Sequence, residues 1–351
     1  MIKELTIKEL LTNDITYETK QYYSQIINSP KINERRGLKI EIEDEDVDKD
    51  ELILNPIIII ELDELSDLEF DTLNIFENIS CTIGGVQIEK INYNQLKICQ
   101  SVEKNKIKKD GLKIFYPINF CSFNENEGFI NCKWYDKTVC IEFTSNPCIS
   151  SIKKLYLRTD SLIAKTKFNY SNVNKYCMDY SSKYDIYRYE NIINKNDDDC
   201  LLMKVKQTQY FGIYNIYPNL INQNIRIPFN HLVEKFFIYF ENKKDNSIYK
   251  QKPFDKIEFI SNGNHIIQFD YETLVVNNNE KIIGYKLPRG VYQIDWKKYF
   301  STNLSCIDNL SIKLYGISTL NDVGFCIIAN NINYLKYHQN NNWVSVLLYA
   351  S

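Results

Sequence analysis

The sequence has few of the residues and motifs on which most enzyme and metal sites depend. It contains only 3 His, and none of His231, His265 and His338 stands in an HxH, HExxH or HxxxH spacing. No Gly-x-Ser-x-Gly elbow or glycine-rich phosphate loop is present. The ten cysteines are scattered, with no pair at the short spacing of a zinc site. We therefore expect no catalytic residue, no cofactor and no metal site, and the alternative is an enzyme whose site is assembled from distant residues.

Long apolar runs and a strong net charge are also missing. The longest apolar run, Pro56 to Ile60, is too short to cross a membrane and predicts a buried strand. Charged residues interrupt Met1–Asp14, so we expect no signal peptide and reduced thiols in a cytosolic setting. The net charge of -3 supplies no global positive field, so we expect no direct nucleic-acid binding and no membrane insertion.

Aromatic residues are abundant, with 26 Tyr and 18 Phe against 11 Gly and 3 Met. Aromatic and β-branched side chains favour strands. Short apolar or alternating runs broken by turn residues recur along the chain, and they predict strands of about five residues. These runs are 57–62, 79–83, 112–115, 139–143, 155–157, 201–205, 225–227, 236–240, 257–260, 266–269, 310–314 and 344–348. Tyr93 to Val102 is the one internal stretch of the first half that looks helical, so the pattern indicates an all-β protein with few short helices.

Three segments organise the chain. Met1–Asp14 predicts a short amphipathic helix, which would dock as an arm on a neighbour or lie on its own domain. The acidic run from Glu41 to Glu51 predicts a solvated loop or strand edge. The polar interval from Asn169 to Asp199 is the candidate linker. We therefore expect an N-terminal arm and acidic segment at 1–50, a first β-sandwich at 51–195 and a second at 196–351.

Several segments, read in order, resemble the major capsid proteins of nucleocytoplasmic large DNA viruses. They are 79–88 with Gly84 and Gly85, 114–121 with Pro117, 224–237 with Phe229, Asn230 and His231, 258–263 with Asn262 and Gly263, 304–312 with Asp308 and Asn309, and finally 330–336 and 346–351. Leu232 replaces the family's usual Pro and Cys306 its usual Arg, and the family's glycine-rich stretch near the C terminus is absent.

The resemblance implies a double jelly roll, which consists of two tandem jelly-roll β-sandwiches. The ten residues named within the resembling segments, from Gly84 to Asn309, would be structural motif positions. It also implies a virion protein without catalysis, assembled in the host cytoplasm, that forms pseudo-hexagonal homotrimers tiling an icosahedral shell. Its partners would be its own copies and neighbouring capsid proteins, with room for a viral membrane beneath. A transient scaffold or a minor capsid component of the same fold is an alternative role. A jelly-roll carbohydrate-binding module is an alternative of another class, although the position of most Tyr and Phe in strand runs favours core packing.

Overall fold

The computed structural model describes most of the expected strands. The described residues are 15–23, 25–26, 37–42, 50–62, 76–83, 86–102, 107–117, 139–145, 152–164, 200–216, 222–230, 232–300, 304, 307, 309–317, 322–338 and 343–346. The expected arm, most of the acidic run, the polar interval and the 195/196 boundary lie outside these residues.

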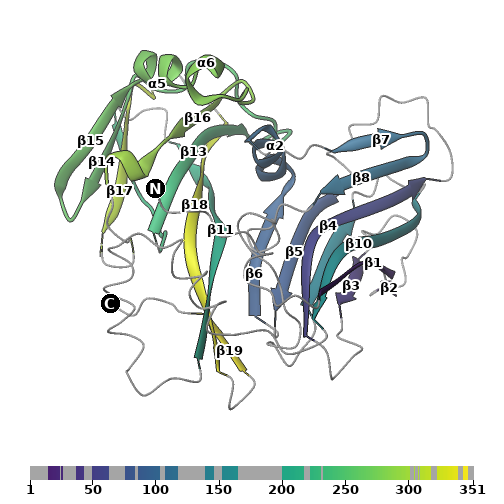
Figure 1. Cartoon of the computed structure of the whole chain (residues 1–351). Helices are drawn as coiled ribbons and strands as arrows, with labels where there is room; N and C mark the ends of the chain where they lie inside the picture. The colour runs from purple at the N-terminus through teal and green to yellow at the C-terminus, as the bar shows by residue number, and fades with distance from the viewer. Residues whose placement is uncertain are drawn as a thin grey trace. The chain divides into compact units, whose positions relative to one another are not determined.

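The chain forms two compact units, and the first contains two five-stranded sheets (Figure 1). One sheet has the order β1 (Ile15–Tyr23), β10 (Ile152–Ala164), β4 (Asp50–Leu62), β8 (Lys113–Pro117), β7 (Lys108–Asp110). The other has the order β2 (Gln25–Ile26), β3 (Gly37–Ile42), β9 (Val139–Ser145), β5 (Phe76–Ile83), β6 (Val86–Asn92). Neighbouring strands run antiparallel, as β4 and β10 do.

The second unit holds most of two further antiparallel sheets. One has the order β11 (Cys200–Asn215), β18 (Val323–His338), β13 (Leu232–Asn242), β16 (Val291–Ile294), and β19 (Trp343–Val346) also pairs with β18. The other has the order β12 (Asn222–Arg226), β17 (Leu310–Tyr315), β14 (Lys256–Ser261), β15 (Asn264–Asp270). Its helices are α2 (Tyr93–Val102), α5 (Tyr271–Asn277), α6 (Glu280–Ile283) and the 3-10 turn η3 (Trp296–Lys298). The all-β prediction is confirmed, and the architecture is a pair of jelly-roll sandwiches.

Several strands are much longer than the expected five residues. β10 spans 13 residues, and β11 and β18 span 16 each. In β10, the polar stretch Arg158, Thr159 and Asp160 interrupts the apolar pattern, yet the pairing with β4 continues past it through a register shift. A β-bulge absorbs one extra residue without ending the ladder, so the apolar pattern underestimates such strands.

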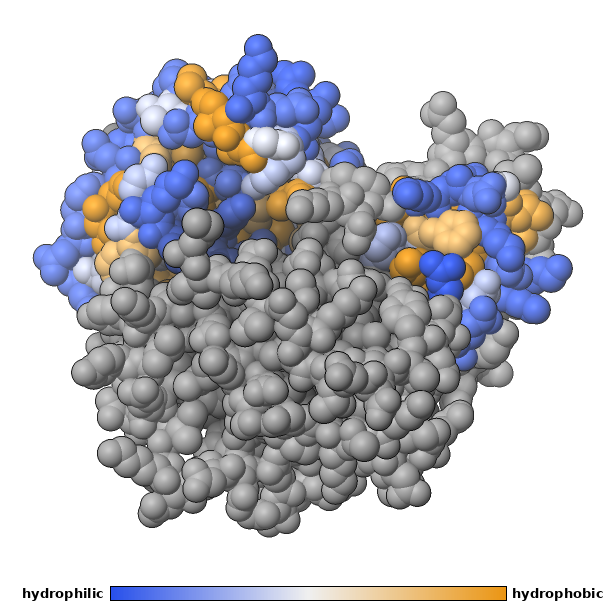
Figure 2. All heavy atoms as spheres, viewed as in Figure 1, coloured by the Kyte–Doolittle hydropathy of each residue, from blue (hydrophilic) through white to orange (hydrophobic). Residues whose placement is uncertain are grey.

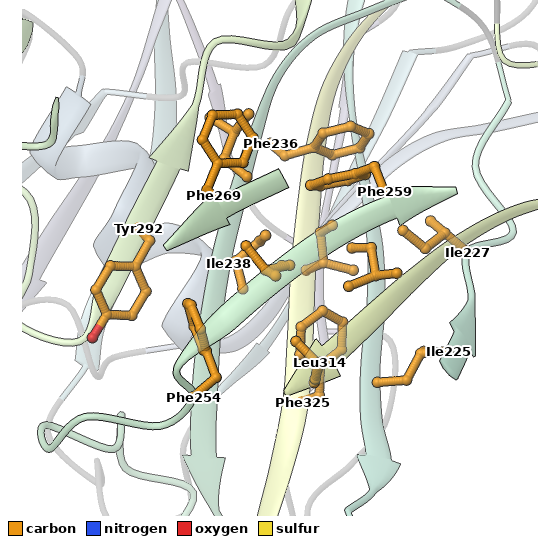
Figure 3. Close-up of a cluster of buried hydrophobic side chains, with 14 of the residues drawn as sticks. Ile225, Ile227, Phe236, Ile238, Phe254, Phe259, Phe269, Tyr292, Leu314 and Phe325 are labelled. Carbon is orange, nitrogen blue, oxygen red and sulfur yellow. The ribbon is translucent and has the colours of Figure 1, made fainter. Parts of the chain in front are cut away.

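Strand β13 is buried on both of its faces. Successive strand residues point to opposite sides of a sheet, and Phe236, Ile238 and Phe240 belong to the main core cluster. Figure 3 shows Phe236 and Ile238 within this cluster. Phe237 and Tyr239 face the other side, where they pack in a second cluster that includes Ile98 and Cys326. The sheet containing β13 therefore lies between the β12-β17-β14-β15 sheet and helix α2.

Helix α2 has the bounds expected from the sequence, Tyr93–Val102. Ile98, which is 1% exposed, and Val102 pack on the sheet of the second unit. The helix thus belongs to the second unit although it directly follows β6 of the first unit in the chain. Helices α5 and α6 lie together at one end of the second unit (Figure 1). They were not among the expected elements, because each is at most two turns long.

Each unit has an aromatic core between its two sheets. In the first unit, the Phe76 ring of β5 meets the Tyr116 ring of β8, with 5.9 Å between ring centroids. In the second, the ring of Phe236 lies 5.7 Å from that of Phe259 on the facing sheet and 5.1 Å from that of Trp296. Aromatic pairs at such distances add to the stabilisation from area burial. Core packing thus accounts for many of the aromatic residues.

Candidate functional site

The sequence-predicted motif residues that the structure describes lie at turns and next to strand ends. Pro117 ends β8, opposite Ile57 of β4. Phe229 is 5% exposed and stacks on Phe236 in the core of the second unit, with 5.9 Å between ring centroids. Gly84, Gly85, His231 and Asp308 lie outside the described residues.

Asn230 links two strands of one sheet through its backbone. Its N–H donates to Oε1 of Gln209 on β11 at 3.1 Å, and its carbonyl accepts from Nδ2 of Asn331 on β18 at 3.3 Å. The residue itself is exposed. These contacts satisfy the backbone N–H and carbonyl of Asn230.

The structure brings together Asn262, Gly263 and Asn309. Asn262 and Gly263 form the two-residue turn between β14 and β15, with φ angles of 48° and 82°. Positive φ at both positions is typical of a type I′ hairpin turn, for which Asn-Gly is a preferred pair. The Asn262 side chain accepts a hydrogen bond from the Asn309 N–H, and the Asn309 carbonyl accepts one from the Asn262 N–H. Side chain and backbone therefore fix the turn to the start of β17.

An accessible polar cluster lies on the outer face of the β14-β15-β17 sheet. The Glu258 carboxylate accepts from the Tyr315 hydroxyl at 2.6 Å and lies 2.8 Å from Nδ1 of His265. Lys256 and Lys313 lie over the Tyr315 ring, with their Nζ atoms 4.1 and 5.0 Å from its centroid. The Tyr315 hydrogen bond, followed by that of His265, lowers the pKa of Glu258. This cluster is a solvated network that ties three strands together.

A second polar cluster is buried beneath α2. Glu241 of β13 is 6% exposed, and its carboxylate accepts hydrogen bonds from the Asn94 amide of α2 and, at 3.8 Å, from the Cys326 thiol of β18. The Tyr210 hydroxyl lies 3.5 Å from the Cys326 sulfur. Burial raises the pKa of Glu241, and the two hydrogen bonds offset part of that rise. Burial also raises the pKa of Tyr210.

Apolar side chains are exposed where α5 and α6 cap the second unit. Val275 and Val276 of α5 and Ile282 of α6 are 45%, 61% and 62% exposed. Figure 2 shows apolar atoms at this end of the unit, among hydrophilic neighbours. Exposed apolar side chains in such small numbers are common on protein surfaces.

The described part of the chain shows neither a metal-ligand cluster nor a membrane-spanning helix. Within the ranges given above, no three His, Cys, Asp or Glu side chains gather as metal ligands would. Among the same residues, no helix is both long and apolar enough to span a bilayer. Cys81, Cys99, Cys140 and Cys326 are thiols that take part in no disulfide.

The sequence reasoning missed both polar clusters. Glu241 follows the run Phe236 to Phe240, and a charged residue directly after a fully apolar run is a usable signal for a buried carboxylate. Its partner Asn94 is 147 residues away, and the sequence carries no sign of that pairing. The Glu258 cluster depends on the register of β14 against β17, which the sequence does not specify.

Solved structures of similar architecture are found among viral capsid proteins. The chain is similar to PBCV-1 VP54, in a structure fitted into a reconstruction of the virophage Sputnik, with 13% identity and a TM-score of 0.66 over 98% of this chain and 100% of that one. It is also similar to the PBCV-1 virus capsid model, with 14% identity and a TM-score of 0.65 over 98% and 100% of the two chains.

A third similar structure is the MCP of Sulfolobus Turreted Icosahedral Virus, with 11% identity and a TM-score of 0.55 over 91% of this chain and 97% of that one. No family model matches the sequence, and no curated protein does. The likeness at these identities is one of fold, and it extends over nearly the whole of the chains compared. The chain has the double jelly-roll fold of viral capsid proteins.

Proposed function

We propose that the protein is a structural component of a virion that assembles with copies of itself into pseudo-hexagonal trimers tiling an icosahedral shell. The observation that carries the proposal is the similarity to the PBCV-1 capsid structure over 98% of this chain and 100% of that one. In this proposal the protein has no catalytic activity.

The geometry of two sandwiches per chain supports a trimer. Three chains with two similar jelly rolls each would present six similar corners, which suit a hexagonal lattice. The closed threefold symmetry of a trimer requires a contact of the obligate kind between two different patches of each chain. Many weak lattice contacts would then add by multivalency. We propose that the first jelly roll is built mainly from 51–195 and the second mainly from 196–351.

The proposal also covers partners and location. Neighbouring capsid proteins would contact the trimers within the virion, and assembly would take place in the host cytoplasm. The acidic run from Glu41 to Glu51 would meet a basic surface on a neighbour, because dense like charges are stabilised by opposite charge across an interface. Reversal of these charges to lysine would then abolish lattice formation, and unchanged assembly would refute this contact.

Light scattering after size exclusion tests the oligomer directly. The proposal predicts a particle of three times the 41.6 kDa chain mass. Electron microscopy of the same fraction should show pseudo-hexagonal outlines, single or in lattices. A strict monomer at every concentration, with no ordered lattice, would refute the proposal and favour a binding module.

A further inference from the structure

The first unit carries an excess of positive charge at one end of its β1-β10-β4-β8-β7 sheet. The strand register places four charged residues side by side across this end: Lys154 of β10, Glu61 of β4, Lys113 of β8 and Asp110 of β7. Three further lysines lie next to this row and are exposed: Lys108, Lys109 and Lys153. The five lysines, which we call the lysine surface, face only the two carboxylates of the row.

Most of this charge has no ionic partner in the described part of the chain. The Lys113 ammonium lies 3.0 Å from the Glu61 carboxylate, and its hydrogen bond lowers the pKa of Glu61. No other lysine of the surface lies within 4.0 Å of a carboxylate of the described residues. Strand β7 is the edge strand of its sheet, and all of its residues are exposed. The lysine surface is therefore accessible to an acidic partner.

The chain itself contains a segment of the opposite charge, the acidic run from Glu41 to Glu51, with eight carboxylates and one lysine. The run ends in the first two residues of β4, whereas Glu61 is the last but one residue of the same strand. At about 3.3 Å per residue, Asp50 and Glu61 lie roughly 35 Å apart along β4. Figure 1 shows β3, which contains Glu41, toward the opposite end of the first unit from β7. The chain thus enters and leaves the run away from the lysine surface.

The acidic run is too short to reach the lysine surface of its own chain. Only residues 43–49 connect β3 to β4. Each of them is at most four residues from one end of this link, and four residues of extended chain span at most about 14 Å. That length is less than half of the separation along β4. The acidic run can therefore meet a lysine surface only on another copy of the chain.

We propose that the acidic run from Glu41 to Glu51 of one chain docks on the lysine surface of a neighbouring copy in the shell. The contact joins two different regions of the chain, so it is heterologous and can pass from each copy to the next. Complementary charge favours this arrangement, whereas a contact between two like regions would bring charges of the same sign together. The inference rests on the proposed assembly into a shell and specifies the surface that meets the acidic run.

Charge reversal in the full-length chain tests the contact, with electron microscopy to find the lowest protein concentration that gives ordered lattices. The first variant changes to Glu the four lysines of the surface that have no ion pair, Lys108, Lys109, Lys153 and Lys154. The second changes to Lys four carboxylates of the run, Glu43, Asp44, Glu45 and Asp46. Each variant alone should need a concentration about tenfold higher or more, because repulsion replaces attraction at several charge pairs.

An equal mixture of the two variants separates a contact between copies from other effects of charge. In the mixture, the reversed run of one variant meets the reversed surface of the other, and the unchanged run meets the unchanged surface. Ordered lattices should therefore return at about the wild-type concentration. A mixture that assembles no better than either variant alone would overturn the proposal.

A matched control reverses four exposed lysines of the second unit and changes the net charge by the same amount: Lys244, Lys250, Lys281 and Lys286. It should assemble as the wild type does, and a loss equal to that of the first variant would overturn the proposal. Unchanged assembly of the first variant would also overturn it and would leave the β7 lysines as protection of an edge strand. In both cases the wild type still forms lattices, whereas a wild type that forms none refutes the proposed assembly and this contact together.

Discussion

Asn262 and Asn309 form two reciprocal hydrogen bonds across 47 residues of sequence. The Asn309 N–H donates to Oδ1 of Asn262 at 3.1 Å, and the Asn262 N–H donates to the Asn309 carbonyl at 2.9 Å. The pair follows directly on the last rung of the β14–β17 ladder, Ser261 opposite Leu310. The Asn262 side chain thus accepts the hydrogen bond that a backbone carbonyl of β14 would accept if the strand continued. At this position the backbone has already entered the turn to β15.

Asn262→Ala should destabilise this hairpin by about 1 to 3 kcal/mol, because it removes a side-chain acceptor and places alanine at a left-handed φ of 48°. Asn262→Gly loses the acceptor but tolerates that φ, so it should cost less than the alanine variant. Urea denaturation of both variants measures the difference. An equal loss in the two would show that the left-handed backbone contributes nothing.

Gly290→Ala should be more damaging than Gly263→Ala, although both glycines have positive φ, 92° and 82°. A Cβ at Gly290 would lie 2.2 Å from the Tyr249 carbonyl oxygen, whereas one at Gly263 meets no atom within 4 Å. The matched pair separates close approach from backbone strain, which alone costs about 1 to 2 kcal/mol. Thermal melts should rank Gly290→Ala lowest, and identical melting temperatures would contradict the steric argument.

Phe236→Ala should cost about 3 to 5 kcal/mol of stability in the second unit, because it removes a fully buried ring and leaves a cavity. Phe236 contacts Phe229, Phe259 and Trp296, so the cavity opens at the centre of the aromatic cluster. Val276→Ala, at a side chain that is 61% exposed, is the control and should change stability by no more than about 0.5 kcal/mol. Hydrogen exchange in β13 and β14 reports the loss.

Tyr315→Phe should make the second unit more sensitive to acid. The Tyr315 hydroxyl is the main cause of the lowered pKa of Glu258. A carboxyl with a lowered folded pKa stabilises the protein above its unfolded pKa, and this contribution is lost as the pH falls through the folded pKa. Removal of the hydroxyl should raise the pKa of Glu258 and shift the acid unfolding midpoint upward. Glu258→Gln should abolish the difference between Tyr and Phe at position 315, and a difference that persists in this background would assign the effect elsewhere.

The strand positions and one helix were predictable because both depend on local pattern. Alternating or continuous apolar runs placed the cores of β5, β9, β13 and β17, and α2 has the expected bounds. Their extent was less predictable, because β10 continues through polar residues that its partner β4 keeps in register. Tertiary pairing extends such a strand where local preference would end it.

Long-range contacts account for what the sequence did not reveal about the sites. The turn at Asn262 and Gly263 has a local signature, but its attachment to Asn309 depends on how β14 and β17 align. The hydrogen bond from Asn94 to Glu241 joins residues from different halves of the chain. Neither half contains a pattern that identifies the partner.

The position of α2 in the sequence has a consequence for synthesis. The ribosome makes Asn94 147 residues before Glu241, so the helix is complete long before the sheet that it covers. Closing so long a loop is slow, because the chain entropy is lost before the contact forms. Until then, Phe237 and Tyr239 would lack the cover that Ile98 provides. A fragment started at residue 196 should aggregate for the same reason, and a separately supplied peptide carrying residues 93–102 should improve its solubility.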